Sequence, residues 1–508
     1  MLTRNKNRLL NFLSKFHTPI WLFLLLTIVL IFRIPSFFEP YSYGDEMIYL
    51  TLGHAIRQGI PLYKGIHDNK PPLLYMVAAI AGNLFWFKAI LAIWNLTTIF
   101  FFWKLVNTLF PKNLRLEKIS TLIFALLTTI PLFEGNIVNA ELFMIGPTIL
   151  AFYLLLTKKL KPKNLIITGV LFSISTLFKV PAVFDTSAIL FLWVISIKKL
   201  NKKEIFSFLR NTAYLALGFL LPIILTFVWY YIRGASTSQY LSAAYLQNIG
   251  YLSSWRHGDV QRSFLEKNSP LLIRALIVLV GFIILYLKKE RLSKQFMFVS
   301  SWLILTLFAA TLSERPYPHY LIQSIPPFSI LFGMLLTLKN REQTFSLLPL
   351  TLFFLVPYYF NFWLYPVVPY YQRFISFALS GITKEEYFSG FGSHIPRNYK
   401  VADFITSSTK PNEKIFVWGD DSVIYALTKR LPPIKYVTDY HIKDFSSPEY
   451  VINTLNTTMP SFIVILPNSP NFPELDRFIK RNYGLIETID EAKIWKLLGP
   501  NVRALMAR

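Results

Sequence analysis

The stretch Tyr43-Gly44-Asp45-Glu46-Met47 places two adjacent carboxylates just after the first long apolar segment, residues 19–34. Charged groups at a membrane boundary are costly to keep there, so such a pair marks a functional site by default. The run Asp68-Asn69-Lys70-Pro71-Pro72 follows, and its lysine is held extended because a proline restricts the residue before it. An acid pair and a rigidly presented cation therefore share one loop.

The composition is that of a membrane protein. The chain has 508 residues, of which 53% are hydrophobic and 16% charged, and its mean hydropathy is +0.43. This is too apolar for a soluble protein, so we predict a polytopic α-helical membrane protein. The absence of cysteine excludes disulfides, thiolate metal sites and a cysteine nucleophile. The formal net charge of +24 falls in short clusters between apolar runs, which indicates membrane orientation rather than nucleic-acid binding.

The basic clusters predict the topology. Arg4, Lys6, Arg8 and Lys15 precede the first apolar run, and no small-residue cleavage site follows it, so we expect a retained first helix with a cytoplasmic N-terminus. Residues 72–82 are too short to cross a hydrocarbon core of about 30 Å and are expected on the outer surface. The eleven predicted spans are 19–36, 84–108, 119–135, 140–157, 164–180, 182–198, 211–231, 270–287, 295–312, 320–338 and 344–365.

This predicted topology assigns the remaining charged clusters to one side of the membrane or the other. It puts the basic clusters at 158–163, 198–203, 288–291 and 339–341 in the cytoplasm. It puts another set of polar groups on the outer side, at or between span ends. These are Glu141, Lys179, Arg256 in the loop 232–269, and the run Glu314-Arg315-Pro316-Tyr317-Pro318-His319-Tyr320. Acids and cations gathered at one membrane face indicate chemistry on a lipid headgroup there.

The chain after residue 365 changes character. Residues 414–419, 461–467 and 492–498 are expected to form strands, and residues 421–429 and 473–481 helices. We therefore predict a transmembrane catalytic domain, 1–365, with an outer loop at 37–83, and a soluble extracytoplasmic α/β domain, 366–508. The soluble part carries no dinucleotide-binding, P-loop or zinc-protease motif, and is interpreted as a partner- or acceptor-side module.

The ordered motifs resemble those of one enzyme group. They are Gly-Asp-Glu at 44–46, Asn-Lys-Pro-Pro-Leu at 69–73, Asn-Ala-Glu at 139–141, Lys179, and the run at 314–320. Together they are similar to the GT-C glycosyltransferases of the dolichyl-phosphate-mannose protein mannosyltransferase and aminoarabinose transferase group. The likeness covers roughly residues 19–330, and the soluble part is similar in kind to that of many bacterial members. Glu141 stands where relatives often have aspartate.

The resemblance implies an activity and a set of roles. Such enzymes move a hexose or pentose from a polyprenyl-phosphate donor to a protein, lipid or glycan acceptor on the outer side, with inversion. The acceptor must lose a proton, which calls for a carboxylate base, and cations neutralise the leaving phosphate. We expect Asp45 as the base with Glu46 as its orienting neighbour. Lys70, Arg256, Arg315 and His319 are expected to bind phosphate, Glu141 is a second acidic site, and Lys179, Glu314 and Tyr320 are further candidates.

Several readings stay open at this stage. Asp45 and Glu46 could serve only the N-terminus of a helix, Lys70 could snorkel to headgroups, and Glu141 could be an N-terminal acid of its span. His319 could be a satisfied interfacial histidine, and Tyr317 with Tyr320 an aromatic belt. No cofactor is required, although a divalent metal would have Asp45 and Glu141 as ligands if one assists. A transporter or a cell-envelope assembly protein is the alternative function.

Overall fold

The computed structural model describes residues 18–197, 201–250 and 264–506. Its contacts divide the chain into two compact units, each built from three segments. Unit 1 comprises Met1–Ser36, Lys88–Thr226 and Ile249–Val367, and unit 2 comprises Phe37–Phe87, Phe227–Asn248 and Val368–Arg508. The predicted soluble domain thus clusters with two segments that precede it in the chain.

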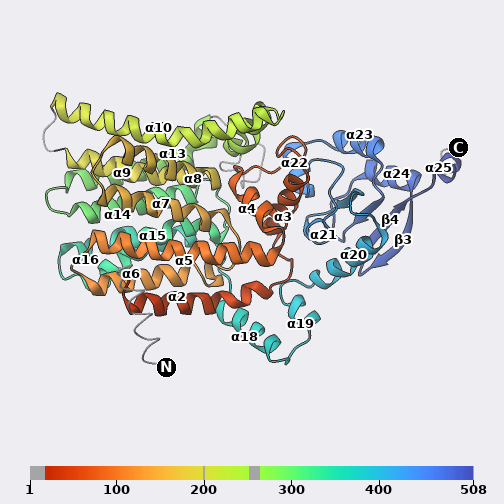
Figure 1. The fold of residues 1–508 in the computed structure, drawn as a ribbon, viewed down its shortest axis with the longest axis horizontal. Coiled ribbons are helices and arrows are strands. Elements are labelled where there is room, and N and C mark those ends of the chain that lie inside the picture. The colour runs from red at the N-terminus through yellow and green to blue at the C-terminus, as the bar shows by residue number, and fades with distance from the viewer. Residues whose placement is uncertain (1–17, 198–200, 251–263, 507–508) are drawn as a thin grey trace, which may run out of the picture. The chain divides into compact units, whose positions relative to one another are not determined.

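Unit 1 is helical (Figure 1), and helix lies within every predicted span, although 119–135, 320–338 and 344–365 each include parts of two helical elements. Residues 84–108 form one continuous helix, as predicted. The elements are α2 Ile20–Arg33, η1 Ile34–Phe38, α5 Leu84–Leu109, α6 Leu114–Leu127, η2 Pro131–Phe133, α7 Ala140–Thr157, α8 Pro162–Phe178, η3 Val180–Ala182, α9 Val183–Ser196, α10 Lys202–Ile232, α13 Phe264–Leu287, α14 Lys294–Ala310, η5 Pro318–Ser324, α15 Ile325–Thr337, α16 Arg341–Phe345 and α17 Leu347–Tyr359.

The apolar helices make this a membrane protein. Among the described residues, six helices are long and apolar enough to cross a membrane. They begin at Ile20, Leu84, Ala140, Lys202, Asn268 and Pro318. Leucines and isoleucines of α10 and α13, such as Leu225 and Ile273, point outward and are 57% exposed, which fits a lipid environment better than water. Several of the other predicted spans are shorter helices, so the count of eleven stays a prediction.

Small residues let helices of unit 1 approach closely. Gly169 of α8 and Gly218 of α10 face each other, and a Cβ on either glycine would collide with a backbone carbonyl oxygen of the opposite helix. In lipid, where the hydrophobic effect does not drive helices together, such close backbone contact is a main source of packing energy. The two glycines therefore fix how α8 and α10 pack.

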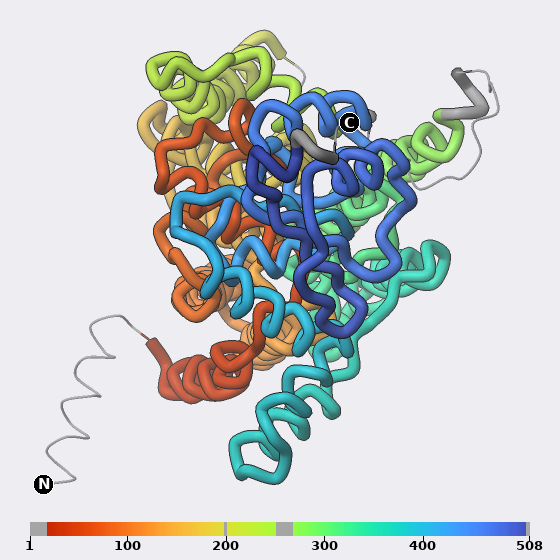
Figure 2. The backbone as a smooth tube through the Cα atoms, turned by 90° about the vertical axis from the view of Figure 1, so that its right-hand side faces the viewer, coloured from red at the N-terminus to blue at the C-terminus, as the bar shows by residue number. Residues whose placement is uncertain are grey.

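Unit 2 holds a four-stranded sheet surrounded by helices (Figure 1 and Figure 2). The strand order is β1-β2-β4-β3, with β1 and β2 parallel and the other pairs antiparallel. The elements are α3 Gly44–Arg57, α4 Leu73–Ala81, α11 Thr237–Leu241, η4 Ser242–Leu246, α12 Gln247–Gly250, α18 Val367–Ala378, α19 Lys384–Ser389, α20 Ile395–Ser408, β1 Ile415–Trp418, α21 Val423–Thr428, α22 Asp439–Phe445, α23 Pro448–Thr458, β2 Phe462–Ile465, α24 Pro473–Asn482, β3 Tyr483–Ile489, β4 Ala492–Leu497 and α25 Pro500–Met506.

The core of this α/β part is apolar, which accounts for the apolar sequences of its buried strands. Phe416, Ile463 and Tyr483 lie in one buried cluster with residues of α22, α23 and α24. The three predicted strands and the two predicted helices are all present. Strand β3 was not predicted. The predicted fold class, a helical membrane protein with a small C-terminal α/β domain, is confirmed.

Candidate functional site

Asp45 lies in the first turn of α3. The N-cap residue Tyr43 makes no side-chain cap, and the acids at 45 and 46 favour the helix N-terminus through the helix dipole. Asp45 does more than this, because Tyr49 Oη, one turn later, donates to Asp45 Oδ2 over 2.8 Å, and Lys70 Nζ lies 3.5 Å from the same oxygen. The Asp45 side chain is 29% exposed, so it can meet a ligand.

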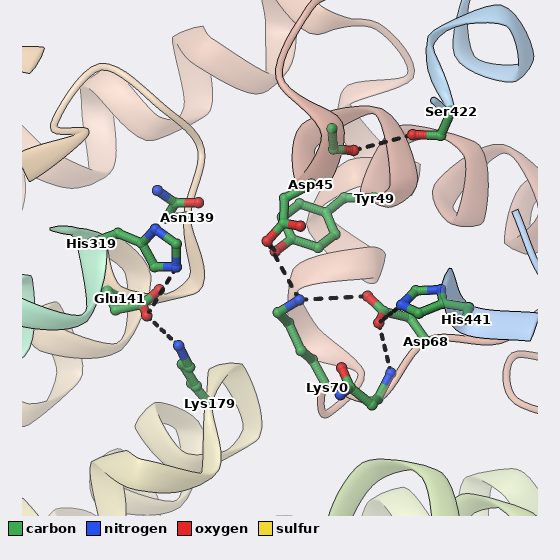
Figure 3. Close-up of polar contacts among 12 residues, drawn as sticks. Asp45, Tyr49, Asp68, Lys70, Asn139, Glu141, Lys179, His319, Ser422 and His441 are labelled. Atoms are coloured by element: carbon green, nitrogen blue, oxygen red, sulfur yellow. Dashed lines mark hydrogen bonds and ion pairs between the residues drawn. The ribbon is translucent and has the colours of Figure 1, made fainter. Parts of the chain in front are cut away.

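Lys70 points toward two carboxylates, as Figure 3 shows. Its ammonium lies 3.5 Å from Asp45 and 3.8 Å from Asp68, and 5.1 Å from the centre of the Tyr49 ring. Asp68 was not among the predicted site residues. It is 1% exposed and accepts hydrogen bonds from Tyr75 Oη and from the Asn69 backbone N–H, both over 2.7 Å. This geometry favours a functional role for Lys70 over a lysine that snorkels to headgroups.

The groups around Asp68 favour the ionised form of its carboxyl group. Burial raises the pKa of Asp68, but the ammonium of Lys70, then His441 and the Tyr75 hydrogen bond, lower it by more, so the net pKa is below its ordinary value. Burial, together with the charge of Asp45, raises the pKa of Tyr49 well above its usual range, so Tyr49 stays a hydrogen-bond donor. Asp68 therefore remains ionised beside Lys70 at neutral pH.

The C-terminal segment of unit 2 holds this loop in place. His441 Nε2 of α22 lies 3.6 Å from Asp68 Oδ1, and burial lowers the pKa of His441. The backbone N–H of His67 donates to the Lys435 carbonyl over 2.7 Å. Ser422 Oγ donates to the Gly44 carbonyl over 3.1 Å, at the start of α3. Residues that are distant in the sequence therefore hold both the loop that carries Lys70 and the start of the helix that carries Asp45.

A second polar cluster lies in unit 1, at the start of α7 and the end of α8 (Figure 3). Lys179, the C-cap of α8, forms an ion pair with Glu141 in the first turn of α7. The Lys179 ammonium also lies 4.0 Å from the centre of the Tyr320 ring. His319 Nε2 lies 3.9 Å from Glu141 Oε1. The structure therefore brings together four residues that the sequence marked separately.

Glu134 completes this cluster and was missed by sequence reasoning. It adopts a left-handed backbone with φ of 61°, and its side chain is 1% exposed. Glu134 Oε2 lies 2.7 Å from His319 Nδ1 and accepts a hydrogen bond from Asn139 Nδ2 over 2.8 Å. His319 thus lies against two carboxylates, and Tyr317 stacks on its ring.

The remaining predicted residues take other positions. Glu46 is 1% exposed and lies among the buried residues of α3. Glu314 forms an ion pair with Arg274 Nη2 over 2.8 Å, and Arg315 follows it in the same loop. Arg256 lies outside the residues that the structure describes.

Comparison with solved structures identifies the architecture. No family model and no curated protein matches the sequence. The crystal structure of ArnT, an aminoarabinose transferase, from Cupriavidus metallidurans bound to undecaprenyl phosphate has a TM-score of 0.54 at 12% identity, covering 94% of this chain and 98% of that chain. The apo structure of the same protein has a TM-score of 0.52, also at 12% identity, and covers 94% and 97%. The chain has the GT-C fold.

The residues of this GT-C chain do not form a ready metal centre. Within the described ranges, no group of three or more histidines and carboxylates is placed to hold a metal ion. Of the two carboxylates named as ligands, Asp45 lies against Lys70 and Glu141 against Lys179. Each of these two acids therefore has a lysine as a partner.

The Asp45 and Lys70 pair places a proton acceptor beside a cation. Asp45 is a partly exposed carboxylate able to accept a proton, and Lys70 is a cation, 21% exposed, that can meet an anionic leaving group. Asp68 and Tyr49 hold these two side chains, so that the pair is preorganised before a ligand arrives.

Proposed function

We propose that this protein is a glycosyltransferase that moves a sugar from a polyprenyl-phosphate donor to an acceptor on the outer side of the cell membrane, with inversion. The single observation that carries the proposal is the ion pair of Asp45 and Lys70, over 3.5 Å, in a chain with the GT-C fold. The positive-inside distribution of its basic clusters supports a cytoplasmic N-terminus and an outer site.

The reaction needs one base and one cation. The acceptor O–H or N–H attacks the anomeric carbon, the bond from that carbon to the phosphate oxygen breaks, and its electron pair leaves with the phosphate. The acceptor proton goes to the Asp45 carboxylate, which is the general base. Phosphate is already a good leaving group, so no general acid is required.

Lys70 has two roles in this mechanism. In the unliganded protein it neutralises Asp45 and Asp68. When the donor binds, its phosphate competes for the ammonium, which draws Lys70 toward the leaving group and frees Asp45 to accept a proton. Asp68, held by Tyr75 and Asn69, keeps the lysine stem in place during this exchange.

The cluster in unit 1 supports an accessory role. Glu141, Lys179, Tyr320 and His319 form one connected network at the ends of α7 and α8. Lys179, 16% exposed, is a second cation suited to a phosphate oxygen. We propose that Lys179, His319 and Arg315 bind phosphate within unit 1, and that Glu141 orients Lys179.

The test is the Asp45→Asn variant. It keeps the side-chain volume but cannot take the acceptor proton, so transfer should fall by about 10² to 10⁴ while donor binding survives. Purified protein is incubated with a panel of radiolabelled polyprenyl-phosphate sugars and candidate acceptors. Label leaving the lipid is measured, with donor binding recorded in parallel, in chelator and in excess divalent ion.

The control is Asp476→Asn, an exposed aspartate of α24, which should transfer at the wild-type rate. Transfer by Asp45→Asn close to wild type would remove Asp45 from the mechanism, because a role only at the helix N-terminus affects stability and not proton transfer. A wild-type protein that moves no label from any donor would contradict the glycosyltransferase and favour a transporter or an assembly protein.

A further inference from the structure

A cavity of about 1100 Å³ lies in unit 2 at the carboxyl ends of β1 and β2. Trp418 ends β1, and residues 466–472 follow β2, so both strands run into it. The start of α20, the helix α22 and the turn between β3 and β4 form its other walls. In α/β sheets the carboxyl ends of parallel strands are the usual place for a ligand.

The strand-end loops of this cavity are fixed. Gly419 has φ of 143°, and a Cβ there would lie 2.9 Å from the Cβ of Leu466 in the neighbouring loop. Ser469 Oγ lies 2.9 Å from the carbonyl oxygen of Trp418 and 2.6 Å from that of Leu466, in hydrogen-bonding geometry to both. Trp418 Nε1 donates to the Pro470 carbonyl over 2.9 Å. The two loops are tied together, so the cavity is formed before any ligand binds.

The cavity walls carry an excess of negative charge. The basic side chains are His394, Arg397 and Lys443, and the acidic ones are Asp420, Asp421, Asp439, Asp490 and Glu491. Asp421 is satisfied locally, by the Asn398 side chain and by the Val423 N–H over 2.9 Å. In the described part of the chain, no hydrogen bond or ion pair to the Asp420 carboxylate is present. Asp420 is exposed in the cavity, and partial desolvation, followed by the charges of Asp439, Asp421 and Asp45, raises its pKa to about 6.

The same wall adjoins the candidate base. Ser422, next to Asp421, donates to the carbonyl of Gly44, next to Asp45. The negative charge of Asp45 acts on both Asp420 and Tyr440, and Tyr440 lines the cavity. The cavity wall is therefore joined to the start of the helix that carries Asp45.

We propose that this cavity binds the acceptor through an ammonium group, which pairs with Asp420 and Asp439 while the acceptor's nucleophile reaches Asp45. The inference rests on the proposed function, because it names the class of acceptor for that same site. A cation of this kind relieves the repulsion between the wall carboxylates, whereas a phosphate or carboxylate ligand would increase it. A bare metal ion fits less well, because within the described residues no three acids or histidines are placed around one point.

The experiment measures binding of two small probes to the full chain in detergent by calorimetry. Glucosamine carries an ammonium group, and N-acetylglucosamine carries a neutral amide at the same position. Glucosamine should bind at least tenfold more tightly at low salt, and this preference should shrink as sodium chloride is raised, because salt screens charge pairs. The Asp420→Asn and Asp439→Asn double variant should lose the preference, and the exposed Asp476→Asn control should keep it.

Several results would overturn the inference: equal affinity for the two probes, no binding of either, or a preference that the double variant retains. The salt series uses the wild-type protein alone, so it decides the matter even if the double variant does not fold. Removal of label from the lipid donor is measured on the same preparations. If label leaves the donor but glucosamine shows no preference, the acceptor class is wrong and the transferase stands; if glucosamine binds preferentially but no label moves, the cavity is a cation site and the transferase fails.

Discussion

At the residue scale, Lys70 is where the charges of the site meet. It has Asp45 and Asp68 within 4 Å, at 3.5 and 3.8 Å, and only Asp68 is fully buried. A buried carboxylate with a hydrogen-bonded frame holds a lysine more firmly than a partly exposed one does, because fewer waters compete. We infer that Asp68 positions Lys70, and that Asp45 is the partner that can be exchanged for a ligand.

The first prediction concerns this positioning residue. Asp68→Asn keeps acceptors and donors near Tyr75 and Asn69 but removes the charge that holds Lys70, so the Michaelis constant for the lipid donor should rise about tenfold or more. The maximum rate should change less than in Asp45→Asn. Steady-state kinetics over a range of donor concentrations separate the two constants. A fall in the maximum rate alone, with the donor constant unchanged, would contradict a positioning role.

Sequence reasoning reached Asp45 and Lys70 but not their partners. The acid pair and the Lys-Pro-Pro turn stand out because charge and proline are rare beside a membrane span. Asp68 lies two residues before Lys70, yet nothing in the sequence says that its carboxylate turns inward to Tyr75. His441 approaches Asp68 from a distant segment, and in the other cluster Glu134 reaches His319 from a left-handed turn. Such pairings depend on tertiary contacts, which one sequence does not reveal.

At the scale of elements, hydrophobic runs predicted the apolar helices and the buried strands, but not α18, α19, α20, α22, α23 and α25 of the C-terminal part. Residues 415–418 and 462–465 are strongly apolar and mostly buried, and they pair in parallel. Strand β3 was missed because most of its side chains are exposed, including Leu485 and Glu487, so its pattern is mixed. An edge strand forms because β4 offers it hydrogen bonds, not because its own sequence demands it.

The second prediction tests the end of β1. Gly419→Ala places a Cβ 2.9 Å from Leu466 at a φ of 143°, a conformation that only glycine adopts easily, so it should destabilise unit 2 by about 1 to 3 kcal/mol. The thermal unfolding midpoint of the purified protein should fall measurably. Gly499→Ala, where a Cβ meets nothing within 4 Å, is the matched control and should unfold close to wild type. Equal midpoints for the two variants would show that the loop after β1 is not constrained.

At the scale of the whole molecule, the fold follows from composition and charge order. Apolar runs of spanning length predict a membrane protein, and the GT-C fold of the solved ArnT structures agrees with the ordered motifs. The sequence could not show that residues 37–87 and 227–248 cluster with the C-terminal part, because such grouping depends on contacts between distant segments. The number of spans and the side on which each terminus lies remain predictions from hydropathy and basic clusters.

The last prediction tests the orientation of the chain. The cysteine-free background allows single cysteines to be placed at two exposed positions, Ser408 at the end of α20 and Lys161 between α7 and α8. The basic cluster around Lys161 should be cytoplasmic and residues after 365 extracytoplasmic, since positive loops are retained inside. Ser408→Cys should therefore react with an impermeant maleimide in intact cells, and Lys161→Cys only after lysis. Labelling of Lys161→Cys in intact cells, with Ser408→Cys protected until lysis, would reverse the orientation and place the Asp45 site in the cytoplasm.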